Sequence, residues 1–248
     1  MPANVDSAPI TCTEDVARLL QPVVVGGDIL AYSYVRELHR AFGIERTIVL
    51  ATQNIKMLSE SRFTDYRLEP HIHEQEGLYN ALERIAREVH GAHPEKTLLI
   101  LGCDDCHARM LSQGKQRLQD LGYVVPYIDF PLLDDITQKR RFYEICEELD
   151  IPFPKTWYFD CGNGPDELPV DEFPCPLIAK PSNSAQFQGA EPSIEGWRKI
   201  YEIESPEELA QVWRSIRTSD YNNLLVLQDF IPGGDDAIRT LTTFSDAS

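Results

Sequence analysis

Two lysines that lie far apart in the chain are the residues best suited to bind a phosphate-rich ligand. Lys139 lies in a stretch with helical periodicity, and Lys180 ends the apolar run 177–180, directly before Pro181. A lysine at the end of a buried strand projects its ammonium group from a rigid platform. A triphosphate in turn needs cations fixed at more than one of its phosphates. The two positions therefore predict a polyphosphate site, provided that the fold brings them together.

Two further segments have the composition that a nucleotide site needs. The small, polar stretch 182–189 follows Lys180, and as a loop it could fold over phosphates with its N–H groups. The run 225–236 begins as an apolar strand, which could meet adenine through its backbone. It ends in a Gly-Gly-Asp-Asp turn, whose acids could accept hydrogen bonds from ribose hydroxyls. The candidate residues in the two segments are Ser182, Ser184, Gln228, Asp229, Phe230, Ile231, Asp235 and Asp236.

Each of these residues has a simpler explanation when it is taken alone. Lys139 also fits the exposed side of a helix, and Lys180 fits the end of an amphipathic strand. Asp235 and Asp236 also fit a solvated turn. The order in which the segments follow one another is what favours a shared site.

That order resembles the ATP-grasp superfamily of carboxylate–amine ligases. Residues 139–156 are similar to the opening helix and strand of that family, and 173–181 to its Pro-apolar-Lys-Pro strand. Residues 226–233 resemble its interdomain hinge segment, and the Gly-Gly-Asp turn at 26–28 resembles the glycine turn of the domain before the ATP clamp. The likeness thus covers the whole chain. Within the superfamily it is strongest to D-aspartate ligases, on the turn at 26–28, residues 125–129, and 228–236 followed by Arg239.

The resemblance implies an ATP-dependent ligase that activates a carboxylate as an acyl phosphate, which an amine then attacks. D-aspartate ligases join the β-carboxyl of D-aspartate to a side-chain amine of a peptidoglycan stem peptide, so these are the expected small-molecule substrates. Other carboxylates and amines stay open, as does a non-catalytic nucleotide-binding module of the same fold.

The resemblance also implies roles for individual residues. Lys139 and Lys180 would contact ATP phosphates, and 182–189 would be the phosphate loop. Residues 229–231 would meet adenine, and Asp235, or Asp236 in the other register, would hold the ribose. Arg239 would reach a phosphate or the substrate carboxylate, which makes it the one catalytic candidate in this chain.

In the family, the magnesium ligands lie on later strands that this sequence does not contain. The basic residue that stabilises the acyl phosphate is also missing from this sequence. Residues 240–244 are typical of one arm of a hairpin whose partner is not in the sequence. We therefore expect ATP and Mg²⁺ as cofactors of the whole protein and no metal ligands in these 248 residues. We also expect a truncated chain that does not turn over alone.

Two other patterns are given less weight. Cys103 and Cys106 have the spacing of redox or zinc pairs, with His107 adjacent, but no second such pair occurs, so we interpret them as structural thiols. His71 and His73 would share one face of a strand, yet a polar loop or edge strand explains them without a metal. A dinucleotide-binding protein is disfavoured because the turn at 26–28 lacks the G-x-G-x-x-G pattern.

The elements that must position these residues follow two patterns. In the first half, apolar runs alternate with amphipathic helices, which indicates a parallel sheet covered on both faces. From residue 134 the pattern is α+β: a helix at 134–149, a loop at 161–176, a helix that starts at Ser205, and strands at 177–180, 200–203, 224–230 and 238–244. The predicted fold is α/β, with a Rossmann-like pre-ATP-grasp domain (1–133) and a partial α+β ATP-grasp domain (134–248).

Composition excludes several classes of partner. The net charge of −17 repels nucleic acid and anionic membrane surfaces. No apolar run approaches the roughly 20 residues that span a bilayer. The polar start of the chain lacks the pattern of a signal peptide, and the six cysteines are scattered, so we expect a cytoplasmic protein with reduced thiols. The oligomeric state stays open.

Overall fold

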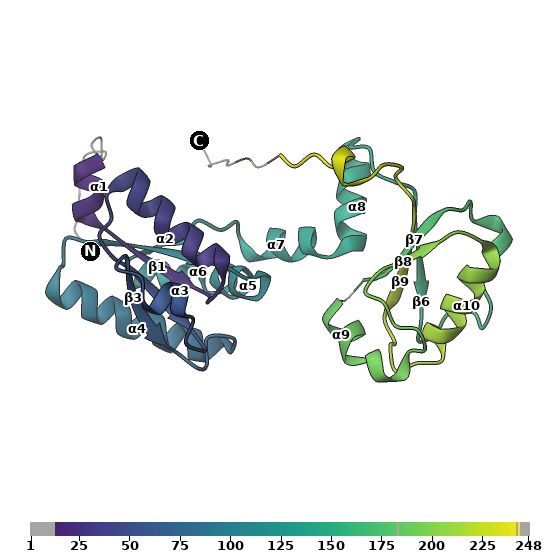
Figure 1. Ribbon diagram of the computed structural model, residues 1–248, viewed down its shortest axis with the longest axis horizontal. Helices are drawn as coiled ribbons and strands as arrows, with labels where there is room; N and C mark the ends of the chain where they lie inside the picture. Colours follow the sequence, from purple (N-terminus) through teal and green to yellow (C-terminus); the bar gives the residue numbers. More distant parts are fainter. Residues whose placement is uncertain (1–12, 183, 242, 244–248) are drawn as a thin grey trace. The chain divides into compact units, whose positions relative to one another are not determined.

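The chain divides into two compact units, one that ends at Asp135 and one that begins at Ile136 (Figure 1). The computed structural model describes residues 13–182, 184–241 and 243. The first unit contains a five-stranded parallel sheet and the second a four-stranded antiparallel sheet. The predicted fold class, a parallel-sheet α/β unit followed by an α+β unit, is confirmed.

The parallel sheet of the first unit has the strand order β3-β2-β1-β4-β5. The strands β2 and β3 therefore lie on one side of β1, and β4 and β5 lie on the other side. In open α/β sheets, ligands bind outside the carboxyl ends of the strands at this change of direction. The strands are β1 (Leu20–Val25), β2 (Thr47–Ala51), β3 (Thr64–Leu68), β4 (Thr97–Gly102) and β5 (Tyr123–Val124).

Helices cover both faces of this sheet, as a continuous apolar strand requires. Val23 and Val25 of β1 pack in one cluster with the apolar side of α4, whereas Val24 packs on the other face with Ala31 and Val35 of α2. The helices of this unit are α1 (Thr13–Leu19), α2 (Ile29–Phe42), α3 (Lys56–Ser59), α4 (Gln75–Ala92), α5 (Asp105–Gln113) and α6 (Lys115–Asp120). The helix α7 (Phe130–Thr137) spans the boundary between the two units.

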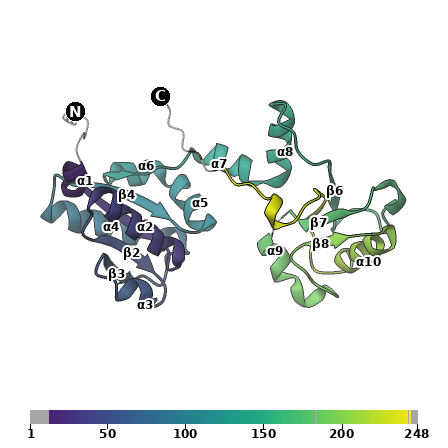
Figure 2. The same cartoon turned by 45° about the horizontal axis from the view of Figure 1, so that its top comes forward.

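The antiparallel sheet of the second unit has the order β6-β9-β7-β8, and one of its faces packs against α10 (Figure 2). Trp213 of α10 is buried in that core together with alternate residues of β7 and β9. The strands are β6 (Thr156–Asp160), β7 (Leu177–Pro181), β8 (Tyr201–Ile203) and β9 (Leu224–Asp229). The helices are α8 (Lys139–Glu148), α9 (Ser184–Gly189) and α10 (Pro206–Arg217), with 3-10 turns η1 (Val170–Glu172), η2 (Glu191–Ser193) and η3 (Asp235–Ala237).

Several local predictions were wrong. The helix expected at 134–149 is interrupted, because Gln138 is extended and separates α7 from α8, whose N-cap it is. The loop expected at 182–189 contains α9, whose Phe187 is buried in the core. Residues 238–241 do not form the expected strand, and Thr242 and Phe244 lie outside the described residues. No strand was predicted at the bounds of β3 or β6. The histidines at 71 and 73 lie in a turn, which agrees with the polar loop that was favoured for them.

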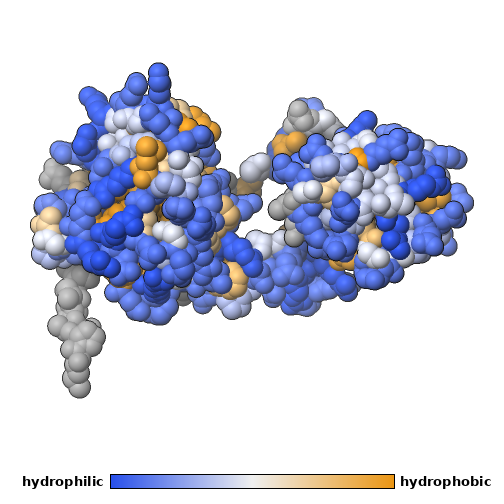
Figure 3. Space-filling model, turned by 90° about the horizontal axis from the view of Figure 1, so that it is seen from below, coloured by the Kyte–Doolittle hydropathy of each residue, from blue (hydrophilic) through white to orange (hydrophobic). Residues whose placement is uncertain are grey.

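The surface agrees with the acidic composition. Figure 3 shows mostly hydrophilic side chains on the visible face of each unit, with apolar side chains in scattered spots. Among the described helices, none has the length and hydropathy to span a bilayer.

Candidate functional site

The candidate site lies on the face of the second sheet that is turned away from α10. Side chains alternate between the two faces of a strand, so the burial of Leu177 and Ala179 in the α10 core places Lys180 on the other face. Lys180 pairs with Val226 of β9, which pairs in turn with Tyr158 of β6. The sequence therefore sets a cation among apolar and aromatic neighbours on this face.

A chain of hydrogen bonds fixes Lys180 on the sheet. Its ammonium group donates to Gln228 Oε1 at 2.9 Å, and Gln228 Nε2 donates to Thr156 Oγ1 at 2.8 Å. The Thr156 hydroxyl donates to the carbonyl of Pro154 at 2.7 Å, which fixes its direction. Gln228 is buried, so its amide is held with the oxygen toward the lysine. Of the predicted residues, Lys180 and Gln228 are thus in direct contact.

Lys139 reaches the same end of β7 from the start of α8. Its ammonium group donates to the carbonyls of Pro181 at 2.9 Å and Ser182 at 3.3 Å. Burial lowers the pKa of Lys139, and the positive charge of Lys180 nearby lowers it further. Neither ammonium group has an acidic partner within the described part of the chain. Two cations thus approach one region of the sheet, and no described carboxylate bonds to either of them.

Two other polar atoms of this sheet are buried without a hydrogen-bond partner: Tyr158 Oη and Asp229 Oδ1. Burial raises the pKa of Tyr158 to about 12, and the neighbouring Tyr143 acts in the same direction. The guanidinium of Arg140 lies 5.9 Å from the centre of the Tyr158 ring. Buried polar groups are normally paired, so the Tyr158 hydroxyl, on the same face as Lys180, could bond to a ligand. Asp229 alternates with the core residues Leu225 and Leu227 and therefore lies on the α10 face. Sequence reasoning missed Tyr158, although alternation along 156–160 could have placed it beside Lys180.

The predicted phosphate loop is more tightly built than a mobile loop. The Ser182 hydroxyl donates to Asn223 Oδ1 at 3.0 Å, and its N–H donates to the carbonyl of Leu224 at 2.9 Å. Ser184 begins α9, and its side chain lies outside the described residues. Since α9 has buried Phe187 at its centre, the segment after Lys180 is anchored rather than free.

The predicted adenine contacts are partly used within the protein. The N–H of Asp229 donates to the carbonyl of Lys155 at 3.0 Å, and that of Phe230 to the carbonyl of Pro176 at 3.3 Å. These two donors are therefore engaged. Ile231 is 68% exposed and is the most accessible of the three predicted residues.

Asp236 and Arg239, a predicted ribose acid and the predicted catalytic candidate, are exposed and follow the end of β9. Arg239 Nη1 donates to the carbonyls of Asp236 at 2.5 Å and Ile238 at 2.9 Å. Asp235 begins the 3-10 turn η3, and its side chain lies outside the described residues. Among the described hydrogen bonds and ion pairs, none joins Asp236 or Arg239 to the two lysines.

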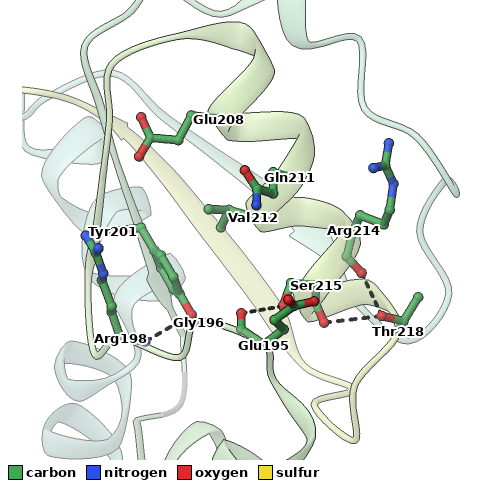
Figure 4. Close-up of a pocket in the computed structure, with 10 residues that line it drawn as sticks. All are labelled: Glu195, Gly196, Arg198, Tyr201, Glu208, Gln211, Val212, Arg214, Ser215 and Thr218. Atoms are coloured by element: carbon green, nitrogen blue, oxygen red, sulfur yellow. Dashed lines mark hydrogen bonds between the residues drawn. The ribbon is translucent and has the colours of Figure 1, made fainter.

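A hollow of about 510 Å³ beside β8 and α10 is not the predicted site (Figure 4). Its hydroxyl groups already bond to the protein backbone: Ser215 Oγ donates to the carbonyl of Glu195 at 2.7 Å, and Thr218 Oγ1 to that of Arg214 at 2.8 Å. Its charged side chains include both signs. It offers no concentration of one charge comparable to the two lysines. The residues that line it are Glu195, Gly196, Arg198, Tyr201, Glu208, Gln211, Val212, Arg214, Ser215 and Thr218.

The fold and the cation pair define a two-unit α/β protein with a candidate anion-binding sheet. Comparison with curated proteins adds a particular relative: the chain is 30% identical over 230 residues to a D-aspartate ligase of Enterococcus faecium (strain Aus0004). This similarity covers 91% of the chain and confirms the predicted resemblance to D-aspartate ligases. The alignment covers 53% of the relative, so the chain spans about half the length of the curated protein it matches.

No family model matches the chain. Among solved structures, a D-alanine–D-alanine ligase of Bacillus anthracis complexed with ATP aligns with 87% of this chain and 60% of its own, at 12% identity and a TM-score of 0.43. A second structure of that ligase aligns with 87% and 58% of the two chains, at 14% identity and a TM-score of 0.45. Scores at this level carry no information on function.

Proposed function

We propose that this chain binds ATP at the Lys139–Lys180 pair and serves an ATP-dependent carboxylate–amine ligase. The observation that carries the proposal is the approach of two ammonium groups, far apart in the chain, to the end of β7 without an acidic partner in the described residues. The 30% identity to a D-aspartate ligase supports the same activity.

The described residues fit a triphosphate. Lys139 and Lys180 would hold its phosphates, and Gln228 would orient Lys180 through the bond that it already makes. Negative charge placed between two close cations offsets their mutual repulsion and part of the desolvation cost of burying them. When bound, ATP would supply the phosphoryl group that activates a carboxylate. We propose no magnesium ligand here, because the one group of three or more candidate metal ligands among the described residues lies in the first unit.

The substrates are proposed from the named relative. D-aspartate would be the carboxylate, activated as an acyl phosphate, and an amine of a peptidoglycan stem peptide would be the acceptor. A cytoplasmic site of action suits both ATP and such precursors. The roles of residues 182–189, 229–231, Asp235, Asp236 and Arg239 remain predictions that only a bound nucleotide can test.

Calorimetric titration of the chain with ATP and magnesium tests the binding step. Lys180→Ala should weaken ATP binding roughly tenfold or more, since a hydrogen bond to a charged group contributes about 1.5–3 kcal/mol. The matched control is Lys199→Ala, an exposed lysine of the same unit, which should bind as the unchanged chain does. Equal affinity in the Lys180→Ala variant would contradict the proposal, and tight NAD binding would favour a dinucleotide protein instead.

A second assay separates a ligase from a non-catalytic nucleotide-binding module. In the whole protein, ADP formation should require both D-aspartate and an amine acceptor. The ligase would be excluded if ADP formed without either substrate, or if no ADP formed with both substrates present. Neither outcome would alter the conclusion from the ATP-binding titration.

A further inference from the structure

A second cluster of chemically reactive side chains lies at the carboxyl edge of the first sheet. Asp104, Cys106 and His107 follow the end of β4, and His73 comes from the turn that precedes α4. The cluster follows β4, the strand at which the direction of strand order changes. It is independent of the Lys139–Lys180 pair, which lies in the other unit.

The ligand atoms of these four residues are already close. One atom from each lies within 4.8 Å of all the others. Cys106 Sγ is 3.7 Å from His73 Nδ1, and Asp104 Oδ2 is 3.3 Å from His107 Nδ1. The two imidazole rings stack with centroids 4.9 Å apart and planes inclined by 18°. Four donors that can each bind a transition metal thus lie close enough together for one ion to be held among them.

His107 is the member that most needs a partner. It is fully buried, and neither ring nitrogen makes a hydrogen bond, since its approach to Asp104 lacks the required geometry. A bound ion beside His107 would supply the partner that its buried ring nitrogens lack.

Asp104 is also free for such a role. It stands at the N-cap position of α5, where an aspartate side chain commonly accepts a bond from the helix backbone, yet it makes no cap hydrogen bond. Its carboxylate lies toward His107 instead. A local helix-capping function therefore does not account for its orientation.

Two glycines allow the parts of the cluster to approach. A Cβ on Gly102 would lie 2.8 Å from the Cβ of His107, and one on Gly77 would lie 2.3 Å from the carbonyl oxygen of His71. Side chains at these positions would displace α5 or the turn that carries His73. The chain thus packs both halves of the cluster at distances that only glycine permits.

We propose that His73, Asp104, Cys106 and His107 form a closed, tetrahedral zinc site that ties the turn before α4 to the start of α5. Two imidazoles, one thiolate and one carboxylate form a donor set that zinc accepts, with bonds of about 2.0–2.3 Å. His73, Asp104 and Cys106 are exposed and can rotate inward around buried His107. On binding, the Cys106 thiol loses its proton to solvent and coordinates as the thiolate.

The expected role is structural, because four protein ligands leave no position for a substrate. The spacing of Cys103 and Cys106 pointed toward this region, but the ligand that completes the site, His73, is distant in sequence. Cys103 is not among the four ligands.

Metal analysis of the purified chain tests the site. The chain is first dialysed exhaustively to remove metal and then given one equivalent of zinc. It should retain about one zinc per molecule through gel filtration. Its cobalt-substituted form should show tetrahedral d–d bands and a thiolate-to-cobalt charge-transfer band. His73→Ala should lose the retained zinc. Cys106→Ser should lose the charge-transfer band. His71→Ala, a matched exposed histidine two positions away, should keep both signals.

Thermal unfolding provides an independent measurement, because an ion that binds the folded state raises its melting temperature with concentration. Zinc should raise the melting temperature of the unchanged chain and of His71→Ala, but not of His73→Ala. The altered side chains at 73 and 106 are exposed, so the variants should fold. No retained zinc in the unchanged chain, or equal retention in all variants, would overturn the proposal.

Discussion

Lys139 combines burial with a like charge nearby, and this combination is costly unless a ligand compensates it. Its ammonium group is held by two backbone carbonyls rather than by an acid. Carbonyl dipoles compensate a buried cation less well than a carboxylate does, so the pKa of Lys139 falls. A residue of this kind indicates a site that is preorganised for an anion.

The lowered pKa of Lys139 has a consequence for stability. Above its folded-state pKa the folded chain binds fewer protons than the unfolded chain, whose lysine titrates near 10.5. The free energy of unfolding contributed by Lys139 therefore rises with pH between these two values. Urea denaturation at a series of alkaline pH values should show this rise, and Lys139→Met should remove it.

Lys199→Met serves as the control for this series, because Lys199 is exposed. Its pH profile should run parallel to that of the unchanged chain. If the Lys139→Met profile were also parallel, the ammonium group would not be perturbed by its surroundings, and the preorganised anion site would lose its main electrostatic support.

The turn between β1 and α2 shows how an element is positioned by a single residue. Gly26 has φ +137°, and a Cβ there would lie 2.6 Å from the Cβ of Cys103. Gly26→Ala should therefore destabilise the first unit by at least about 1–3 kcal/mol, the cost of a strained backbone position. Gly91→Ala, in α4 with nothing within 4 Å of the new Cβ, should instead stabilise by about 0.5–1 kcal/mol.

Chemical denaturation of both glycine variants measures this contrast directly. The change in the free energy of unfolding should have opposite signs for Gly26→Ala and Gly91→Ala, although both variants replace glycine by alanine in the first unit. A Gly26→Ala variant as stable as the unchanged chain would show that β1 and β4 do not approach at this edge as described.

The start of α10 is an element whose ends follow from local chemistry. Ser205 Oγ accepts a hydrogen bond from the N–H of Glu208 at 3.2 Å, and Pro206 occupies the first helical position. Ser205→Ala should cost about 0.5–2 kcal/mol of stability, because it leaves that donor without its cap. Thermal or urea denaturation checks the loss. An unchanged midpoint would mean that the cap is replaced by water.

Elements with strong local signals could be predicted from the sequence, and those set by tertiary contacts could not. The apolar run before Pro181 predicts β7 with Lys180 at its end, and Ser205-Pro206 predicts the start of α10. The segment 184–189 has no apolar period, so α9 depends on the burial of Phe187 in the core. The convergence of Lys139 on β7 and of His73 on Cys106 depends on pairings that sequence spacing does not contain.

At the scale of the whole molecule, the chain has two units with separate cores. A ligand that binds one folded unit stabilises that unit by mass action. In hydrogen-exchange measurements, ATP should increase protection in β7 and β9, and zinc should increase it in the turn before α4 and in α5. Protection of the opposite segments would exclude the proposed locations.

The overall charge of −17 makes local cations decisive for any phosphate ligand. The central claim, that Lys139 and Lys180 act on one polyphosphate, is tested most directly by a double-mutant cycle for ATP binding with Lys139→Ala, Lys180→Ala and the double variant. We predict that the two single losses are non-additive by at least about 0.5 kcal/mol, as for residues that share a partner. Additive losses, or no loss in either variant, would contradict the claim.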